Sequence, residues 1–535
     1  MARHRKSTFC VVLFAGVLLT TTAWAQLPRN VILLIGDGMG FEQVKAASIY
    51  ATGTEDGLVM QTLPYQAEMT TYSANASITD SAASATAMAT GHKVNNGVVS
   101  LAIPGDGSEL ETSLQWHKAR GRSVGLVTTT FMTHGTPAPF GAHNIDRNHT
   151  DEIAWDYLNK TRPHVLLGGG GYGLSPTAAT AAGYHVVTTR SNLLALDTED
   201  PLLTHLSGQF GSTHLPYEYD GTWGDLPHLT DMVVTALAVL DNNPDGFFLM
   251  IEGGRIDHAC HANHLPRSIY ETLEFDDALQ LVLDWAEERN DTLIIVTSDH
   301  ETGGLSVVQN NGAGNWPDVT WSTTGHTAWK VPIYADGPNA HYVSGVLDNT
   351  DIFALTTDPR PTLVVAPSVI NKYVRYAESL PSYVDSFTLS RDGIGTHDYT
   401  ITTDAPWLDV DPDAGILAGQ TDTISLLYND IATMPIGMYE ATITVESMTA
   451  GNSPQTVTVN VVIAAAPGDF DGDGDVDQDD FGVFQRCLGV TDFAAMPECA
   501  WADLNNDGRV NQADRTLWTD CVSGPGIAAD LYCIP

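Results

Sequence analysis

The sequence predicts an α/β protein with two smaller modules at its C-terminal end. From about residue 28 to 360, runs typical of buried strands alternate with helical stretches. This is the pattern of a mostly parallel sheet covered by helices on both faces, a three-layer αβα sandwich. After about Pro367, short β-branched and aromatic runs are broken by turns, which favours a small β-sandwich. Two acidic loops near the end favour a small α-helical module, so we expect domains at 26–362, 367–466 and 468–535.

The first residues, MARHRKSTFCVVLFAGVLLTTTAWAQ, have the features of a secretory signal peptide. A basic opening precedes a short apolar run, and small residues stand at Ala23 and Ala25. We expect residues 1–25 to be cleaved, which makes the mature protein secreted, periplasmic or attached at the cell surface. No later segment has the uninterrupted apolar length of a membrane span.

The strongly negative net charge of the chain limits which molecules it can bind. The 535 residues include 24 Lys and Arg against 65 Asp and Glu, a formal net charge of −41. Such an excess repels nucleic acid backbones, so we expect no nucleic acid partner. It also repels a phosphate ester. An anionic substrate therefore needs local positive charge, which bound metal ions supply.

Four segments are the clearest predicted strands of the large domain: 31–37, 123–130, 247–253 and 292–300. Three of them finish in acidic residues or histidine. In open α/β sheets, ligands bind beyond the carboxyl ends of the strands. We therefore expect one crevice to contain the side chains at those ends, which are Asp37, Glu252, Asp299 and His300.

The stretch TDSAASATAMATG, residues 79–91, predicts a helix that begins at Ser81 and consists almost entirely of small residues. One interpretation is structural: Asp80 caps a helix that packs tightly in the core. The other is chemical, because the positive end of a helix suits a phosphate or a nucleophile that carries negative charge. From this stretch alone both interpretations stay open.

Two groups of residues have the chemistry of cation ligands. In EGGRIDHACHAN, Asp257 and His261 are four residues apart, so a helix places them on one face. With His326 as a third candidate, one carboxylate and two imidazoles make a zinc site that keeps an open position. Asp37, Asp299 and His300 make a second candidate site.

Two segments near the C-terminus match calcium-binding loops, 34 residues apart. Oxygen ligands recur at positions one, three, five, nine and twelve, position seven offers its backbone carbonyl, and glycine stands at the sharp turn. In the first loop these residues are Asp469, Asp471, Asp473, Asp475, Asp477 and Asp480, with Gly474 at the turn. In the second they are Asp503, Asn505, Asp507, Arg509, Asn511 and Asp514, with Gly508 at the turn.

The cysteines divide by position. Cys10 lies in the predicted signal and Cys260 stands alone, while the other four, Cys487, Cys499, Cys521 and Cys533, lie near the C-terminus. Two disulfides there suit an exported protein, but the spacing does not tell which cysteines pair.

Six motifs in order resemble those of the alkaline phosphatases. They are VILLIGDGMG, TDSAASATAMATG, VTTTFMTHGTPAPFGAH followed by Arg147, EGGRIDHACH, VTSDHETGG and TTGHTAW, and together they span about Arg29 to Asp358. The calcium loops, which end in Asp rather than Glu, resemble the paired motifs of dockerin modules over residues 468–535. The β-sandwich region is similar to BACON-type or other immunoglobulin-like modules.

The phosphatase resemblance implies a role for each matching residue. Ser81 is the expected nucleophile that becomes phosphoserine, and Arg147, oriented by Asp80, is expected to bind two phosphate oxygens. The implied ligands of one zinc are Asp257, His261 and His326. Those of a second zinc, which also contacts Ser81, are Asp37, Asp299 and His300. A third ion, usually magnesium, is implied at Asp37, Thr136 and Glu252.

Two positions depart from one branch of that family. His134 and His258 stand where some bacterial enzymes have Asp and Lys. His134 is expected to reach the third ion, whose identity is then open among magnesium, zinc and cobalt. His258 is expected to contact phosphate through water. The segment between Asp299 and His326 is short, which leaves the oligomeric state open.

The sequence supports three functions, two enzymatic and one non-catalytic. The first is a secreted phosphatase of broad specificity for phosphate monoesters, with two zinc ions, one magnesium and two calcium ions. The second is a phosphodiesterase or sulfatase of the same superfamily. The third is a non-catalytic component of the cell surface. The dockerin resemblance adds a cohesin-like protein as a partner, and the natural ester is not readable.

Overall fold

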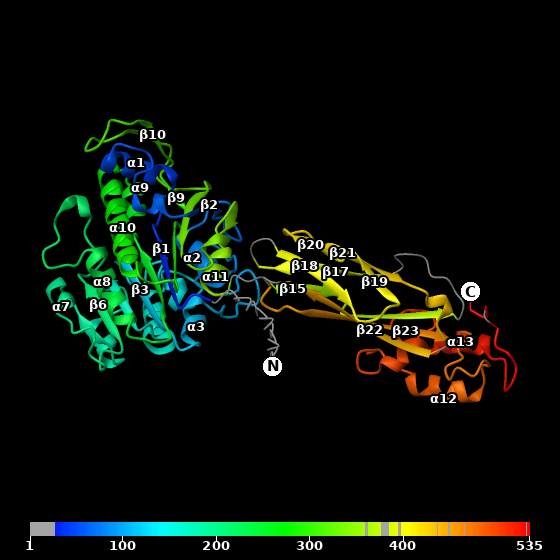
Figure 1. The fold of residues 1–535 in the computed structure, drawn as a ribbon. Coiled ribbons are helices and arrows are strands. Elements are labelled where there is room, and N and C mark those ends of the chain that lie inside the picture. Colours follow the sequence, from blue (N-terminus) through cyan, green and yellow to red (C-terminus); the bar gives the residue numbers. More distant parts are fainter. Residues whose placement is uncertain are drawn as a thin grey trace, which may run out of the picture.

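The computed structural model describes residues 27–358, 362–375, 385–393, 397–435, 437–447, 450–464, 466–530 and 532–534. The predicted signal peptide, residues 1–25, lies outside the described residues. Figure 1 shows a large domain of helices around a central sheet, followed along the chain by a β-sandwich and a small helical module. Within the described ranges, no helix is both long enough and apolar enough to cross a bilayer.

The large domain is built on a sheet of ten strands in the order β14-β2-β13-β8-β1-β7-β3-β4-β6-β5. Only β13 runs antiparallel to its neighbours, so the predicted mostly parallel sheet is confirmed. The strands are β1 (Asn30–Ile35), β2 (Tyr65–Thr70), β3 (Ser123–Phe131), β4 (Val165–Gly169), β5 (His185–Val187), β6 (Leu206–Phe210), β7 (Phe247–Glu252), β8 (Thr292–Thr297), β13 (Val331–Asp336) and β14 (Val346–Asp348).

The four strands expected from the sequence are β8, β1, β7 and β3, and they are consecutive neighbours at the centre of the sheet. All three pairings between them are parallel. Their carboxyl ends therefore open at the same edge. This adjacency is what allows residues far apart in the sequence to meet there.

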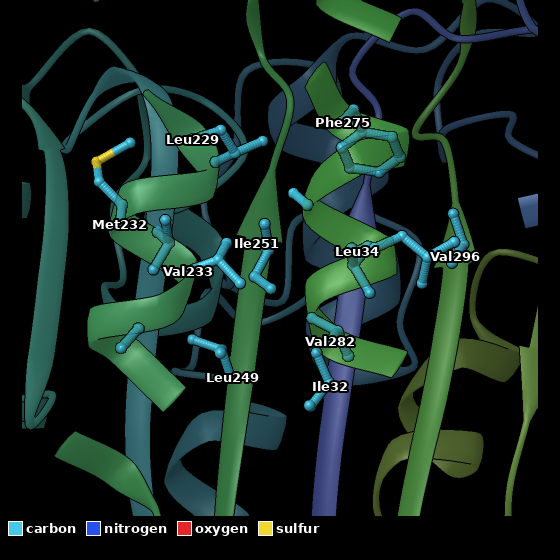
Figure 2. Close-up of a cluster of buried hydrophobic side chains, with 14 of the residues drawn as sticks. Ile32, Leu34, Leu229, Met232, Val233, Leu249, Ile251, Phe275, Val282 and Val296 are labelled. Carbon is cyan, nitrogen blue, oxygen red and sulfur yellow. The ribbon is translucent and has the colours of Figure 1, made fainter. Parts of the chain in front are cut away.

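Helices cover both faces of the sheet, and alternate side chains of each strand point to opposite layers. Ile32, Leu34, Leu249 and Ile251 face one layer of helices, with Phe275 packed over them (Figure 2). That layer contains α1 (Phe41–Thr52), η1 (Val59–Thr62), α7 (Arg190–Leu194), α8 (Leu229–Leu240), α9 (Arg255–His261) and α10 (Leu265–Ala286).

The opposite layer packs against Val31, Leu33 and Met250. It contains α2 (Ser81–Thr90), α3 (Ser113–Lys118), α4 (Ala138–Gly141), α5 (Thr150–Asp156), η2 (Tyr157–Thr161), α6 (Pro176–Ala181) and α11 (Asp351–Thr356). Every residue of α2 is buried. Its small side chains let the helix lie close to the sheet, as the structural interpretation of this stretch requires.

Short elements complete the large domain near the strand ends. β9 (Glu301–Thr302) pairs with β12 (His326–Thr327), and β10 (Leu305–Gln309) pairs with β11 (Asp318–Trp321). The remaining turns are η3 (Glu218–Asp220) and η4 (Ala340–Tyr342). The pairing of β12 with β9 brings His326 beside the segment that follows β8.

The next region forms two small sheets with a shared apolar core, which confirms the predicted β-sandwich. One sheet contains β15 (Thr362–Ala366), β17 (Asp385–Asp392), β21 (Asp422–Tyr428) and β19 (Leu408–Asp411). The other contains β16 (Val369–Arg375), β23 (Gln455–Ala464), β22 (Gly437–Glu446), β18 (His397–Thr403) and β20 (Ala414–Leu417), and η5 (Ile431–Thr433) connects β21 to β22.

The C-terminal module consists of α12 (Gln478–Cys487), η6 (Pro497–Ala502) and α13 (Gln512–Cys521). Its disulfides join Cys487 to Cys499 and Cys521 to Cys533, each across 12 residues. The sequence left this pairing open. The structure shows that each helix end is linked to the segment that follows it, while Cys260 is free and buried in the large domain.

Candidate active site

The carboxyl ends of β1, β7 and β8 carry four side chains that are all fully buried: Asp37, Glu252, Asp299 and His300. The structure brings them together at one edge of the sheet, where α2 and α9 also begin. Burying this many acidic groups without compensation is costly. The arrangement therefore needs positive charge nearby.

The first donor group consists of Asp257, His261 and His326. Asp257 and His261 lie one turn apart on α9, with Oδ2 and Nε2 separated by 3.3 Å. His326 Nε2 lies 3.6 Å from Asp257 Oδ1 and 3.2 Å from His261 Nε2. The ring nitrogens thus point toward one another. His261 Nδ1 and His326 Nδ1 contact the backbone carbonyls of Thr324 and Thr79, which fixes both rings.

The second donor group consists of Asp37, Asp299 and His300. His300 Nε2 lies 3.5 Å from Asp37 Oδ1 and 3.2 Å from Asp299 Oδ2. Ser81 Oγ, at the first residue of α2, lies 3.3 Å from the same His300 nitrogen. A hydroxyl is therefore held at the edge of a buried group of potential cation ligands.

The third donor group uses Asp37 again, with His134 and Glu252, and ligand atoms of all three lie within 4.8 Å of one another. Thr136 Oγ1 lies 3.4 Å from Asp37 Oδ2. Glu252 Oε2 accepts hydrogen bonds from Thr128 and Thr130. Asp37 therefore belongs to the second and the third donor group, and the two sites share this ligand.

The metal-free carboxylates resist ionisation. Burial, followed by the charges of Asp299 and Asp257, raises the pKa of Asp37 well above its usual range. Burial and Asp257 raise the pKa of Asp299 to about 8, and burial raises that of Glu252 to about 7. A cation would reverse these shifts, because it favours the ionised ligands.

The first donor group behaves differently because histidines surround its carboxylate. Burial alone would raise the pKa of Asp257, but the hydrogen bond with His261 and the nearby His300 and His326 lower it strongly. The same hydrogen bond raises the pKa of His261 to about 9. Asp257 is thus ready to bind a cation, and His261 would release its proton when one binds.

The start of α2 confirms the capping interpretation of its sequence and also places Asp80 beside Arg147. Asp80 Oδ1 accepts hydrogen bonds from the backbone of Ala83 and Gly97, each at 3.0 Å, so Asp80 does cap the helix. Its other oxygen accepts a 2.9 Å hydrogen bond from Arg147. Gly135 leaves room for the guanidinium, since a Cβ there would lie 2.1 Å from Arg147 Nη2. One aspartate therefore positions a helix start and an arginine together.

Comparisons with known proteins agree over the large domain. The family model described as alkaline phosphatase matches residues 28–179 and 170–317. Alkaline phosphatase 3 of Bacillus subtilis is 32% identical over 411 residues, which covers 61% of this chain and 87% of the relative. Streptomycin-6-phosphate phosphatase of Streptomyces griseus is 34% identical over 407 residues, with 62% and 90% coverage. The chain belongs to the alkaline phosphatase family.

Solved structures agree with this identification. A cold-active alkaline phosphatase from a psychrophilic Shewanella sp. is 29% identical, with a TM-score of 0.56 over 61% of this chain and 98% of that chain. The alkaline phosphatase of the Antarctic bacterium TAB5 is 28% identical with a TM-score of 0.54, over 62% and 97%. This protein is therefore a phosphomonoester hydrolase, and the alkaline phosphatase fold predicted for it is confirmed.

The residues of this alkaline phosphatase fit bound metal ions. In the described part of the chain, Asp37 Oδ1, Glu252 Oε1, Asp299 Oδ2 and His134 Nδ1 are buried and form no hydrogen bond. Each such atom costs about 1–3 kcal/mol when it stays unpaired. Carboxylate and imidazole donors at these positions are the ligands that zinc prefers. Cations would therefore supply the missing partners.

Two neighbours of the phosphatase centre were missed by sequence reasoning. Thr302 donates a 2.6 Å hydrogen bond to Asp257 Oδ1 and lies 3.2 Å from His300 Nδ1, so it connects the first two donor groups. His214, in the loop after β6, packs beside His134 and His258. No motif marks His214 among 18 histidines. The position of Thr302 two residues after His300 was the only available signal for it.

The C-terminal module is a dockerin, since the model described as dockerin type I domain matches residues 467–519. In its first loop, Asp469, Asp471 and Asp480 bring carboxylate oxygens within 4.8 Å of one another. Asp469 accepts hydrogen bonds from Gly472 and Gly474, and Asp480 from Phe470 and Asp471.

The second loop repeats most of these contacts. Asp503 accepts from Asp507 and Gly508, and Asp514 accepts from Asn505. The ninth residues of the loops, Asp477 and Asn511, are the N-caps of α12 and α13. Each loop is thus already folded around its acidic side chains.

Proposed function

We propose that this phosphatase hydrolyses phosphate monoesters through a phosphoserine at Ser81, at a centre of two zinc ions and a third cation. The observation that carries the proposal is the position of Ser81 Oγ. It lies at the start of a buried helix, 3.3 Å from His300 Nε2, beside donor groups that share Asp37. A serine is a weak nucleophile unless its surroundings stabilise the alkoxide.

The three donor groups suit three cations. Asp257, His261 and His326 would hold one zinc, and Asp37, Asp299 and His300 the other. Asp37, His134, Thr136 and Glu252 would hold the third ion, for which magnesium is one candidate; a TAB5 phosphatase variant is described with Mg bound in its M3 site. When bound, such ions stabilise negative charge on the attacking and leaving oxygens of an in-line displacement.

The catalytic residues would then act one after another. Arg147, held by Asp80 at 2.9 Å, donates two parallel hydrogen bonds to non-bridging phosphate oxygens and orients the ester. Ser81 loses its hydroxyl proton to water and its Oγ attacks phosphorus, the ester P–O bond breaks, and the alcohol leaves with that electron pair and takes up a proton from water. A second water then loses a proton to solvent and attacks phosphorus, the P–Oγ bond breaks, inorganic phosphate leaves, and Ser81 Oγ takes up a proton. His258 would contact the phosphate through water.

The remaining modules suit an exported enzyme held by another protein. Residues 1–25 would be removed on secretion, 26–362 would form the catalytic domain, 367–466 the β-sandwich and 468–535 the dockerin. Each loop of the dockerin would bind one calcium through the loop positions named in the sequence analysis. Its partner would be a cohesin-type protein. Both loops are folded around their carboxylates, which supports the calcium assignment.

Trapping the intermediate tests the mechanism. The enzyme is mixed with p-nitrophenyl phosphate, quenched in acid, and its intact mass is measured. We expect one added phosphoryl group on the wild type and none on Ser81→Ala. Ser84→Ala is the matched control, because Ser84 lies one turn along α2 and contacts the backbone of Asp299. Label on the Ser81→Ala protein would overturn the phosphoserine mechanism.

The wild-type enzyme also distinguishes a phosphomonoesterase from a phosphodiesterase. Bis(p-nitrophenyl) phosphate is a diester, so it cannot place two free oxygens on Arg147 and a third on the metal centre. We expect turnover of the monoester to exceed that of the diester by at least about 10³-fold. Faster diester hydrolysis would favour the phosphodiesterase.

A further inference from the structure

Arg255, the first residue of α9, contacts His258 one turn further along the same helix. Its Nη1 donates a 2.8 Å hydrogen bond to His258 Nδ1. A guanidinium has five N–H donors and no acceptor, and it keeps its proton in proteins. His258 Nδ1 is therefore the acceptor in this contact, and it carries no hydrogen.

This contact fixes the other nitrogen of the His258 ring as well. An imidazolium would place a second N–H and a like charge against Arg255, so the ring is neutral. A neutral imidazole carries one hydrogen, which here has to lie on Nε2. A nitrogen that carries a hydrogen does not ligate a cation, so Nε2 can only donate a hydrogen bond. In the proposed reaction, phosphate oxygens and the water bound to them are the available acceptors.

The fold holds Arg255 from two sides. Its backbone N–H donates a 3.2 Å hydrogen bond to Thr129 Oγ1, near the carboxyl end of β3. Its guanidinium carbon lies 3.8 Å from the centre of the Tyr217 ring, which is a cation–π contact. The loop of Tyr217 is tied to the same strand, because the backbone of Leu215 donates a 2.9 Å hydrogen bond to the carbonyl of Thr129. Arg255 therefore has little freedom to leave His258.

A second arginine lies against the same Tyr217 ring and shows how Arg255 differs. The guanidinium of Arg267 lies 4.2 Å from the ring centre and donates hydrogen bonds of 3.0 and 2.7 Å to Asp220. In contrast, Arg255 Nε is buried and has no hydrogen-bond partner within the described ranges. A buried donor without a partner is costly. Such a cost is more typical of a functional site than of a residue that only stabilises the fold.

We propose that Arg255 is a positioning residue of the phosphatase centre, which holds His258 with its hydrogen on Nε2 so that this nitrogen donates to the phosphate or to its bound water. The inference rests on the proposed function, in which His258 contacts the phosphate through water. Arg255 itself touches no reacting atom. Without it, the His258 ring can turn over and its hydrogen can move to Nδ1, so phosphate should bind more weakly.

Nuclear magnetic resonance tests the position of the hydrogen without relying on turnover. The full-length enzyme, loaded with zinc and magnesium, is labelled with ¹⁵N-histidine, and the His258 signals are identified by their loss in His258→Ala. We expect the wild type to show an unprotonated Nδ1 and a protonated Nε2. A protonated Nδ1 would overturn the inference, whether or not a phosphoserine forms. This test does not need a variant of Arg255 to fold.

Phosphate affinity measures the consequence of losing Arg255. Arg255→Met keeps the length of the side chain but has no donor. It should raise the inhibition constant of inorganic phosphate and KM for p-nitrophenyl phosphate about 10-fold, with kcat nearly unchanged, because His258 is no longer oriented. Arg255→Lys keeps a donor and should lose less. Arg190→Met is the matched control, since Arg190 pairs with Asp231 at the exposed surface, and it should leave both constants unchanged.

A double-mutant cycle shows whether Arg255 acts through His258. In a His258→Ala background, Arg255→Met should change the inhibition constant of phosphate by less than about 2-fold, because the group that it positions is absent. An equal 10-fold loss in both backgrounds would overturn the inference, since the charge of Arg255 would then act on phosphate directly. A folded Arg255→Met enzyme with the phosphate affinity of the wild type would overturn it too.

Discussion

The phosphatase centre and the dockerin loops both collect carboxylates, but they do so by different means. At the phosphatase centre, Asp37, Glu252 and Asp299 come from three strands of one sheet and are buried together. In the first dockerin loop, Asp469 and Asp480 are held by backbone N–H groups of their own loop. Long-range packing therefore positions the carboxylates of the phosphatase centre. In the dockerin, a single twelve-residue loop positions its own carboxylates.

This difference implies different roles for the metal ions. The sheet keeps the phosphatase ligands in place, so removing the proposed zinc ions should leave the large domain folded but inactive. The dockerin has a small core centred on Phe484 and Trp518, and a module of this size usually needs disulfides or metals for stability. Removing calcium should therefore weaken the fold itself. The following predictions test this contrast.

The largest effect should come from the ligand shared by two donor groups. Asp37→Ala removes a carboxylate from both and should lower kcat/KM by about 10⁴-fold, or about 5.5 kcal/mol, because charge stabilisation is lost at both ions. Steady-state hydrolysis of p-nitrophenyl phosphate measures this. Asp284→Ala, on the exposed side of α10, is the control. A stable Asp37→Ala enzyme with near-normal turnover would contradict the shared-ligand geometry.

The dockerin should depend on its disulfides. Replacing Cys487 and Cys499 by serine opens a loop across 12 residues and should lower the free energy of unfolding of this module by about 3 kcal/mol. Hydrogen exchange of α12 and α13 in the intact protein measures this, while phosphatase activity should not change. The pair Cys521 and Cys533 has the same spacing, so a much smaller loss there would argue against loop closure as the cause.

Calcium should stabilise the same module by a similar amount. At a concentration 100 times its Kd, an ion that binds only the folded state adds about 2.7 kcal/mol. We expect this gain to be lost in Asp480→Ala, since Asp480 belongs to the cluster of the first loop. It should persist in Asp479→Ala, whose side chain is exposed. Equal calcium responses in the two variants would contradict the assignment of the loop.

A separate effect concerns the pH dependence of the large domain's stability. In the metal-free enzyme Asp299 has a pKa of about 8 and Glu252 of about 7, against about 4 when unfolded. The folded state therefore holds protons that the unfolded state has released, and the free energy of unfolding of the large domain should fall from about pH 4 to pH 8. Denaturant titrations at several pH values measure this. Zinc should abolish the decline, and a metal-free protein that gains stability over this range would refute the assignment.

Much of the large domain was predictable because local patterns specify it. The strand runs identified β1, β3, β7 and β8, and the small residues of 81–90 identified the start of α2. The rule that ligands gather at strand ends then pointed to Asp37, Asp299 and His300. A continuous apolar run within one segment was enough to predict these strands, because a buried parallel strand is apolar along its whole length.

Other features depend on contacts that no local pattern records. The antiparallel direction of β13 is set by its pairing with β2 and β8. His214 reaches the phosphatase centre only because the loop after β6 is tied to Thr129. The disulfide pairing was open because four cysteines allow three different pairings. Each of these required the tertiary arrangement.

The complete burial of α2 has a consequence beyond tight packing. Ser81 is the first residue of a helix in which every residue is buried in the domain interior. At its far end Gly91 has a φ of 75°, and a Cβ there would lie 3.3 Å from Phe353. A larger side chain at Ala85 or Ala89 would therefore displace α2 as a whole. Reaction rates should thus respond to bulk added one or two turns away from the Ser81 hydroxyl.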